Sequence, residues 1–152
     1  MPHHVGIAEG RLPSKRLSKS DFEGLAAFRN ALRRFLAVSE ERARAAGLTP
    51  QQHQALLSIK GGFPGRDEIS IGDLAEHLLL RNHSAVGLVD RLVKAGHVWR
   101  EPSPLDRRRI CVRLTPQGEA LLNQVSSANL LELKASAHLM RAFLASLDGR
   151  DP

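Results

Sequence analysis

The sequence of 152 residues contains one cysteine, Cys111, and no apolar run that approaches the ~18 residues of a membrane span. An internal disulfide needs two thiols and a cysteine-rich zinc site needs several at close spacing, so both are excluded. The first 20 residues also lack the apolar block of about 7–15 residues that a secretion signal carries. These absences predict a cytoplasmic protein without membrane contact.

Catalytic motifs are missing as well. The sequence contains no His-Glu-X-X-His zinc motif, phosphate-binding loop, nucleophile elbow or Gly-X-Gly-X-X-Gly turn. His3 and His4 are adjacent, but two histidines without a third ligand do not make a metal site. We therefore predict that the protein is not an enzyme and binds no metal or other cofactor.

Positive charge is in excess. Lysine and arginine number 22 against 16 acidic residues, which gives a formal net charge of +6. This balance favours a polyanionic partner such as nucleic acid, although many soluble proteins carry a similar excess without one.

The length fits a single domain with a core of its own, whose stability can still depend on a partner chain.

The chain opens with a segment, residues 1–19, that mixes glycine, proline and basic residues and is predicted to form a flexible arm. Helical spacing of apolar residues begins at Ser20, which has capping-box spacing to Glu23. Gly47 marks the end of this first helix.

Three shorter helices are predicted next. The first begins at Thr49, with Pro50 in its first turn, and the second begins at Ser70, which has capping-box spacing to Asp73. Residues 81–96 repeat the apolar spacing and end on a lysine and a glycine, which predicts a further helix close behind. Its apolar face consists of Ala85, Leu88, Val89 and Leu92.

Strand character replaces helical character in residues 97–114. The segments HVWRE and ICVRL carry β-branched and aromatic residues in partial alternation, and PSPLDRRR separates them, which predicts a hairpin with a long basic tip. Thr115 and Pro116 then start a helix that reaches about Leu147, with a break expected around residues 126–129. The fold class is therefore mainly α with a small β-hairpin wing.

Two short helices joined by a tight connection and followed by a hairpin are typical of a winged helix-turn-helix. In that arrangement the second helix enters the major groove of DNA and the first braces it across the backbone. Consecutive arginines on a protruding tip repel one another, and phosphates or a narrow minor groove relieve this repulsion. The combination predicts DNA binding.

Residues from about 48 to 122 resemble the MarR family of bacterial winged-helix transcription regulators. The resemblance rests on an Asp-X-Arg wing tip followed by Leu-Thr-X-X-Gly, with the segments GDLAEHL and LVDRLVKAGHV before them in the family's order. The matching residues are Asp106, Arg107 and Arg108 for the first motif and Leu114, Thr115 and Gly118 for the second.

The resemblance implies roles for the wing. Arg108 is expected to enter the minor groove, and Asp106 is expected to orient it through an ion pair. Arg107 is expected to contact a phosphate or the groove. Arg109 and Arg113 extend the basic character, and each contacts DNA or points into water.

The resemblance also implies a homodimeric repressor that binds a pseudo-palindromic operator in double-stranded DNA and is released by a small-molecule effector, often an aromatic or phenolic acid. A single domain of residues 20–152 is expected, with a winged helix at about 48–115 and dimerisation helices at about 20–47 and 115–147. Two-fold symmetry suits such operators, because their half-sites lie ~34–36 Å apart.

The start of the fourth helix supplies further DNA-binding candidates, because side chains and backbone N–H groups there can reach phosphates or base edges. They are Arg81, Asn82, His83 and Ser84. Alternatively, Asn82 or Ser84 only caps the helix and His83 is only solvated. Val86 and Gly87 depart from the family's usual composition, and Gly87 costs about 1 kcal/mol against alanine unless a close approach requires it.

Several residues have competing interpretations. Trp99 is expected in the core rather than stacked on a ligand. Cys111 is expected to act as a small apolar residue, with redox sensing as the alternative. His53, Arg29 and Phe28 are weighed for an effector pocket against ordinary surface or core roles. For the whole chain, the alternative is a winged-helix module for protein contacts or for non-specific nucleic-acid binding.

Overall fold

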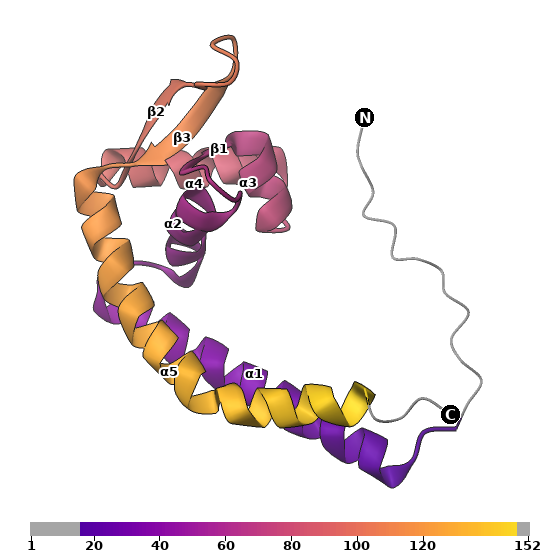
Figure 1. Ribbon diagram of the computed structural model, residues 1–152. Coiled ribbons are helices and arrows are strands. Elements are labelled where there is room, and N and C mark those ends of the chain that lie inside the picture. Colours follow the sequence, from indigo (N-terminus) through magenta and orange to yellow (C-terminus); the bar gives the residue numbers. More distant parts are fainter. Residues whose placement is uncertain (1–15, 149–152) are drawn as a thin grey trace.

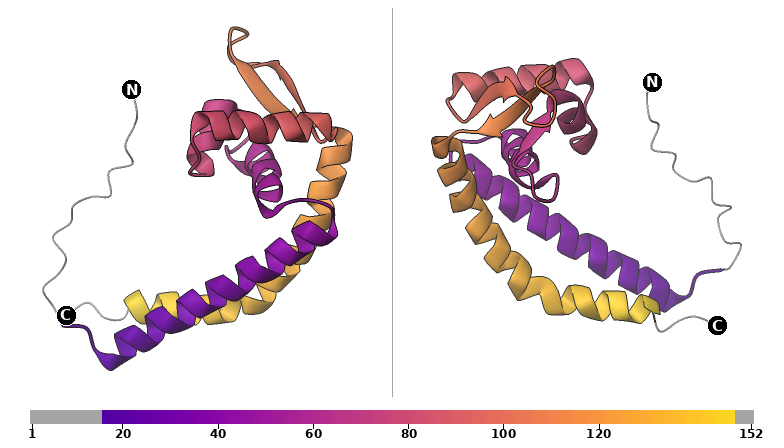
Figure 2. Two further views of the ribbon diagram at one scale, coloured as in Figure 1. Left: turned by 180° about the vertical axis from the view of Figure 1, so that it is seen from behind. Right: turned by 45° about the horizontal axis from the view of Figure 1, so that its top comes forward.

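The computed structural model describes residues 16–148 (Figure 1). Its elements are α1 (Lys19–Ala45), α2 (Pro50–Gly61), β1 (Glu68–Ser70), α3 (Ile71–His77), α4 (Asn82–Lys94), β2 (Val98–Pro102), β3 (Ile110–Leu114) and α5 (Pro116–Asp148). The long helices α1 and α5 lie side by side as an arm, and the other elements form a body at one end of it (Figure 2). This confirms a mainly α fold with a β-hairpin wing.

Side-chain caps fix where α2 and α3 begin, as predicted. The Gln52 backbone N–H donates to Thr49 Oγ1 at 3.1 Å, and the Thr49 N–H donates to Gln52 Oε1 at 3.0 Å. The Asp73 N–H donates to Ser70 Oγ at 3.1 Å, and the Ser70 hydroxyl donates to the Asp73 carboxylate at 2.8 Å. Each reciprocal pair satisfies an N–H group that the first helical turn leaves without an intrahelical partner.

The predicted start of α1 at Ser20 is wrong by two residues. Ser18 caps the helix, and Asp21 completes the capping box by accepting the Ser18 N–H at 2.8 Å. A serine and an acidic residue at this spacing occur twice in succession here, and the earlier pair forms the box. Lys19 is therefore helical, although the sequence assigned it to the N-terminal arm, and residues 1–15 of that arm lie outside the described residues.

The sheet contains one strand more than the predicted hairpin. Its order is β1-β3-β2, with both pairings antiparallel. β1 was not predicted because three residues are too few to show two-residue alternation. Its register places Glu68 opposite Arg113 and Ile69 opposite Val112, and both apolar partners are fully buried. A cross-strand charge pair and a buried apolar pair therefore hold β1 in the sheet.

The core fills the body between α2, α3, α4 and the sheet. On α2, Leu56 and Ile59 face inward as predicted, with at most 1% of either residue exposed. The predicted apolar face of α4 is buried in full; it consists of Ala85, Leu88, Val89 and Leu92. Burial of this face fixes which side of α4 remains free for a partner.

α5 runs through the break predicted around residues 126–129. The Ser127 hydroxyl donates back to the Asn123 carbonyl at 2.8 Å within the helix, and back-bonding of this kind commonly bends a helix. The Asn129 amide donates to Ser39 Oγ of α1 at 2.9 Å, so this polar residue joins the two long helices. α5 is accordingly continuous and curved (Figure 2). Despite the length of α1 and α5, no helix within residues 16–148 has the apolar stretch needed to cross a membrane.

Candidate nucleic-acid interface

The connection between α3 and α4 is tight. The Leu80 N–H donates to the Ala75 carbonyl at 2.8 Å, which closes the end of α3. Leu79 adopts φ 54°, in the left-handed region, where a side chain costs roughly 1–2 kcal/mol. Because 91% of Leu79 is exposed, its own burial does not compensate this cost. The packing of α3 and α4 on each other therefore imposes the turn.

The start of α4 is open. Its N-cap residue is Arg81, and no side chain makes a capping hydrogen bond there, so the alternative that Asn82 or Ser84 caps the helix is wrong. All four candidates are exposed: Arg81, Asn82, His83 and Ser84. The first-turn N–H groups carry the positive end of the helix dipole, which favours an anion.

α4 is held firmly against the wing. Asp90 on its outer side forms an ion pair with Arg100 of β2, while the opposite side of the helix lies in the core. The hairpin projects away from the body beyond this contact (Figure 1). The helix and the wing therefore keep a fixed relation, as simultaneous contact with two grooves requires.

Backbone hydrogen bonds order the wing tip. Asp106 Oδ1 accepts the backbone N–H of Arg108 at 3.0 Å, and the Asp106 carbonyl accepts the N–H of Arg109 at 2.9 Å. The Ser103 N–H donates to the Arg109 carbonyl at 2.8 Å. The predicted ion pair between Asp106 and the Arg108 guanidinium is absent from the described contacts, because the carboxylate caps the turn instead. Asp106 thus orients the tip through the backbone.

The guanidinium groups at the tip are free. Arg107, Arg108 and Arg109 are exposed, and within residues 16–148 none of them has a carboxylate partner within ion-pair distance. Three adjacent cations without counter-charge raise the local potential, and an approaching polyanion lowers it. The tip can therefore bind phosphate.

Arg113, at the base of the wing, has the opposite environment. Its Nε donates to Glu101 at 2.5 Å, one Nη lies 2.7 Å from Asp67, and the other lies 3.5 Å from Glu68. The hydrogen bond to Glu101 is the main reason why the pKa of Arg113 is raised. Three carboxylates thus occupy the guanidinium of Arg113, so it offers no unpaired charge to DNA.

The exposed fractions of Trp99 and Cys111 decide between the competing interpretations of these two residues. Trp99 is 44% exposed on the outer face of β2, so its predicted place in the core is wrong; its neighbour Val98 takes that place with 2% exposed. Cys111 is 2% exposed, and burial raises the pKa of its thiol. A buried thiol with a raised pKa is a poor nucleophile, which supports the structural role predicted for it.

Gly87 leaves space on the exposed side of α4. A Cβ added there would meet only Arg91 Nη1, at 3.6 Å, which is an ordinary contact, so no other helix of the chain requires the glycine. We expect Gly87→Ala to raise the free energy of unfolding by about 0.5–1 kcal/mol in urea denaturation, because alanine is the better helix former. A loss of stability would contradict this. A simultaneous loss of DNA affinity would show that DNA is what approaches the glycine.

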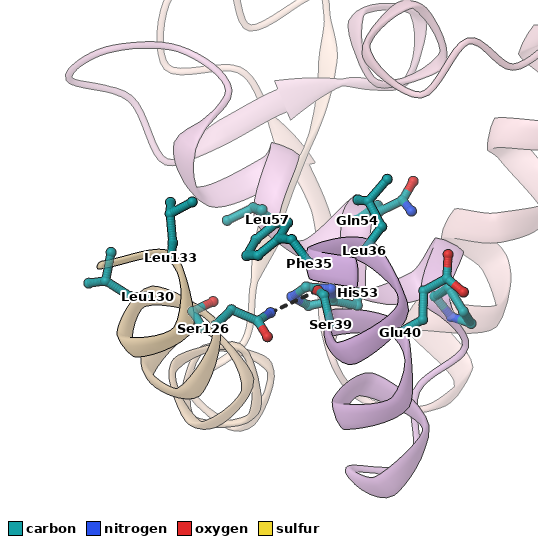
Figure 3. A pocket seen from close by; sticks show the side chains of 12 residues that line it. Phe35, Leu36, Ser39, Glu40, His53, Gln54, Leu57, Ser126, Leu130 and Leu133 are labelled. Atoms are coloured by element: carbon teal, nitrogen blue, oxygen red, sulfur yellow. Dashed lines mark hydrogen bonds between the residues drawn. The ribbon is translucent and has the colours of Figure 1, made fainter. Parts of the chain in front are cut away.

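A pocket of about 440 Å³ lies away from this surface, where α1 and α5 meet α2 (Figure 3). His53 lines it, whereas Phe28 lines a smaller neighbouring pocket and Arg29 lines neither. Most of its wall was not predicted, including Phe35 and Leu133, because the lining comes from three helices, of which α5 is far from α1 and α2 in the sequence. Only the helical spacing of those residues was a signal, and the same spacing also fits a dimer interface or a core.

The body of the structure is similar to known regulators. A model of the MarR family matches residues 46–109, from just before α2 to the wing tip. YcgE of Bacillus subtilis, an uncharacterized HTH-type transcriptional regulator, is 35% identical over 101 residues. That match covers 65% of this chain and 63% of YcgE, so the chain spans less than two thirds of the length of this relative.

Solved structures extend the similarity to the arm. The multiple antibiotic-resistance repressor (MarR) of Listeria monocytogenes is 26% identical and superimposes with a TM-score of 0.58 over 84% of this chain and 83% of its own. RV1404 of Mycobacterium tuberculosis gives a TM-score of 0.66 over 90% of this chain and 97% of its own, at 24% identity. The shared fold therefore includes the long helices as well as the winged body.

Proposed function

Because residues 46–109 match a model of the MarR family, we propose that this chain is a member of that family and a sequence-specific DNA-binding regulator of transcription. The observation that carries the proposal is the contrast between the two ends of the wing. At the base, Arg113 is surrounded by carboxylates, whereas at the tip Arg107, Arg108 and Arg109 are exposed without any. A polyanion supplies the missing counter-charge.

The proposed contacts divide between two grooves. The exposed start of α4, residues 81–84, enters the major groove, where its side chains and N–H groups meet base edges and phosphates. Arg108 enters the minor groove, with Arg107 and Arg109 on phosphates beside it. Gly87 has no side chain that could contact a base. Discrimination between DNA sequences therefore depends on the helix start, the wing and DNA shape.

The active form is proposed to be a homodimer. Large apolar side chains that do not line the pocket at the junction with the body are exposed along both helices of the arm: Phe22, Leu25, Leu32, Leu131, Leu139 and Leu144. Large apolar side chains exposed in this number along both helices favour an interface there. A two-fold axis between two arms places two α4 helices on successive half-sites, which a pseudo-palindromic operator provides.

The pocket at the junction of arm and body is proposed as the effector site of a cytoplasmic repressor. It is bounded by α1 and α5 of the arm and by α2 of the body, so a ligand there contacts both parts. A ligand that prefers one relative position of these parts changes the distance between the two α4 helices. Release from the operator follows when that distance no longer matches the half-sites.

Selection of binding sites from random duplex DNA with the purified chain tests this function. In competition, the selected duplex is expected to bind about 10³-fold or more tightly than random duplex of the same length. Equal affinities would instead support a module for non-specific nucleic-acid binding, and no binding at all would support one for protein contacts.

A further inference from the structure

Among residues 16–148, no lysine or arginine lines the pocket between α1, α2 and α5. Glu40 is the only residue of its lining that carries a full charge at neutral pH, and the rest of the wall is mainly apolar (Figure 3). The adjoining pocket along the arm shares Phe35 and Leu133 with it and has no charged residue in its lining. Among residues 16–148, an anion would therefore meet no unpaired cation in either lining.

Two arginines contact residues of the lining, and both are engaged by groups of the chain itself: Arg42, which donates to Asn129 Oδ1 at 3.4 Å, and Arg44, which pairs with Glu40. One Nη of Arg42 donates to the Ala128 carbonyl at 2.8 Å, and the other lies 3.6 Å from Glu132. Arg44 lies 3.8 Å from Glu40. To pair with a ligand, either arginine would have to give up a partner that it already has.

Apart from Glu40, the polar part of the wall is uncharged. His53 is 5% exposed, and burial lowers its pKa from the usual value of a histidine, which favours the neutral imidazole. His53 Nε2 and Ser126 Oγ are buried without a hydrogen-bond partner among the described residues. A neutral imidazole nitrogen and a hydroxyl can each pair with an uncharged amide or hydroxyl group. Since both atoms are covered by neighbouring side chains, a ligand reaches them by displacing those neighbours.

We propose that this pocket binds an uncharged, mainly apolar molecule about as large as two fused aromatic rings and rejects the carboxylate of the same shape. A volume of about 440 Å³ suits a ligand of that size. A carboxylate would lose its hydration beside Glu40 and gain no free cation in return. The proposal rests on the proposed function in assigning a ligand to the pocket, and it departs from the aromatic acids that the family resemblance implies.

A matched pair of probes tests whether the pocket prefers an uncharged ligand to the carboxylate of the same shape. Naphthamide and naphthoate substituted at the same ring position are titrated calorimetrically into the purified full-length chain without DNA, at neutral pH. We expect the amide to bind at least about tenfold more tightly than the carboxylate. Tighter or equal binding of naphthoate, or no binding of either probe, overturns the proposal.

A cation added at the pocket should change this preference. Gln54 is exposed and lines the pocket, so Gln54→Arg is expected to raise naphthoate affinity about tenfold and to change naphthamide affinity by less than about twofold. Gln51→Arg is the control, because Gln51 is exposed on the same helix but does not line the pocket. Equal effects of the two variants would place the probe elsewhere and overturn the proposal.

The failure of this inference is distinguishable from failure of the proposed function. Both titrations are made without DNA, and binding to the selected duplex is measured separately. A chain that binds its selected duplex but prefers naphthoate overturns only the ligand class. A chain that prefers naphthamide but selects no duplex overturns the proposed function.

Discussion

The affinity of the chain for its selected duplex is expected to fall by about 10³–10⁵ when salt rises from 50 to 200 mM. Four arginines of the proposed interface have no carboxylate partner in the described structure: Arg81, Arg107, Arg108 and Arg109. A homodimer brings eight of them to the duplex, within the roughly 6–10 phosphate contacts for which a fall of this size holds. Fluorescence anisotropy of a labelled duplex at several salt concentrations measures it.

The slope of log affinity against log salt concentration measures how many cations the wing tip contributes to DNA binding. Arg108→Ala removes two cations from the dimer, so the slope of log affinity against log salt is expected to decrease by about 2. Arg44→Ala is the control, since it removes the same charge from an exposed position at the end of α1 and should leave the slope unchanged. A flat response of the unmodified chain, or equal slopes for all three proteins, would contradict phosphate binding by the tip.

Elements with a local signal could be predicted from the sequence. Thr49 and Gln52 form their box three residues apart, and Thr115 with Pro116 starts α5 where expected, because each signal and its partner lie within one turn. β1 could not be found in this way. Its pairing depends on Glu68 meeting Arg113, far along the chain, and no local pattern records that contact.

The same difference between local signals and contacts of distant residues explains which site residues could be predicted. The exposed arginines of the tip were predicted correctly, because a protruding turn has no core to bury them. The sequence leaves Arg113 either in contact with DNA or in water, since alternation along a strand tells only which face a side chain takes. Which acids occupy that face depends on the fold, and here Asp67 and Glu101 come from other elements. The residues that line the pocket could not be predicted for the same reason, because only the fold brings them together.

The junction of the wing and α5 is held by one threonine. The Thr115 hydroxyl donates to the Gly96 carbonyl at 2.7 Å and accepts the Gly118 N–H at 3.0 Å. The Thr115 N–H donates to the His97 carbonyl at 3.0 Å. The first turn of α5 is thereby drawn against the backbone that leads into β2. The Leu-Thr-X-X-Gly sequence thus has a physical basis, because the threonine makes the contact and the glycine leaves room for it.

Gly118→Ala is therefore expected to lower the free energy of unfolding by about 3 kcal/mol or more, or to prevent folding. A Cβ at Gly118 would lie 2.0 Å from the His97 carbonyl oxygen, a backbone atom that no side-chain rotation can move. Gly72→Ala is the control, since its Cβ would meet only Ser70 Oγ at 3.9 Å and alanine favours the helix. In urea denaturation followed by circular dichroism, the control should match or exceed the unmodified chain. Equal stability of the two variants would show that α5 can move away from the wing, and the arm would then not be fixed to the DNA-binding body.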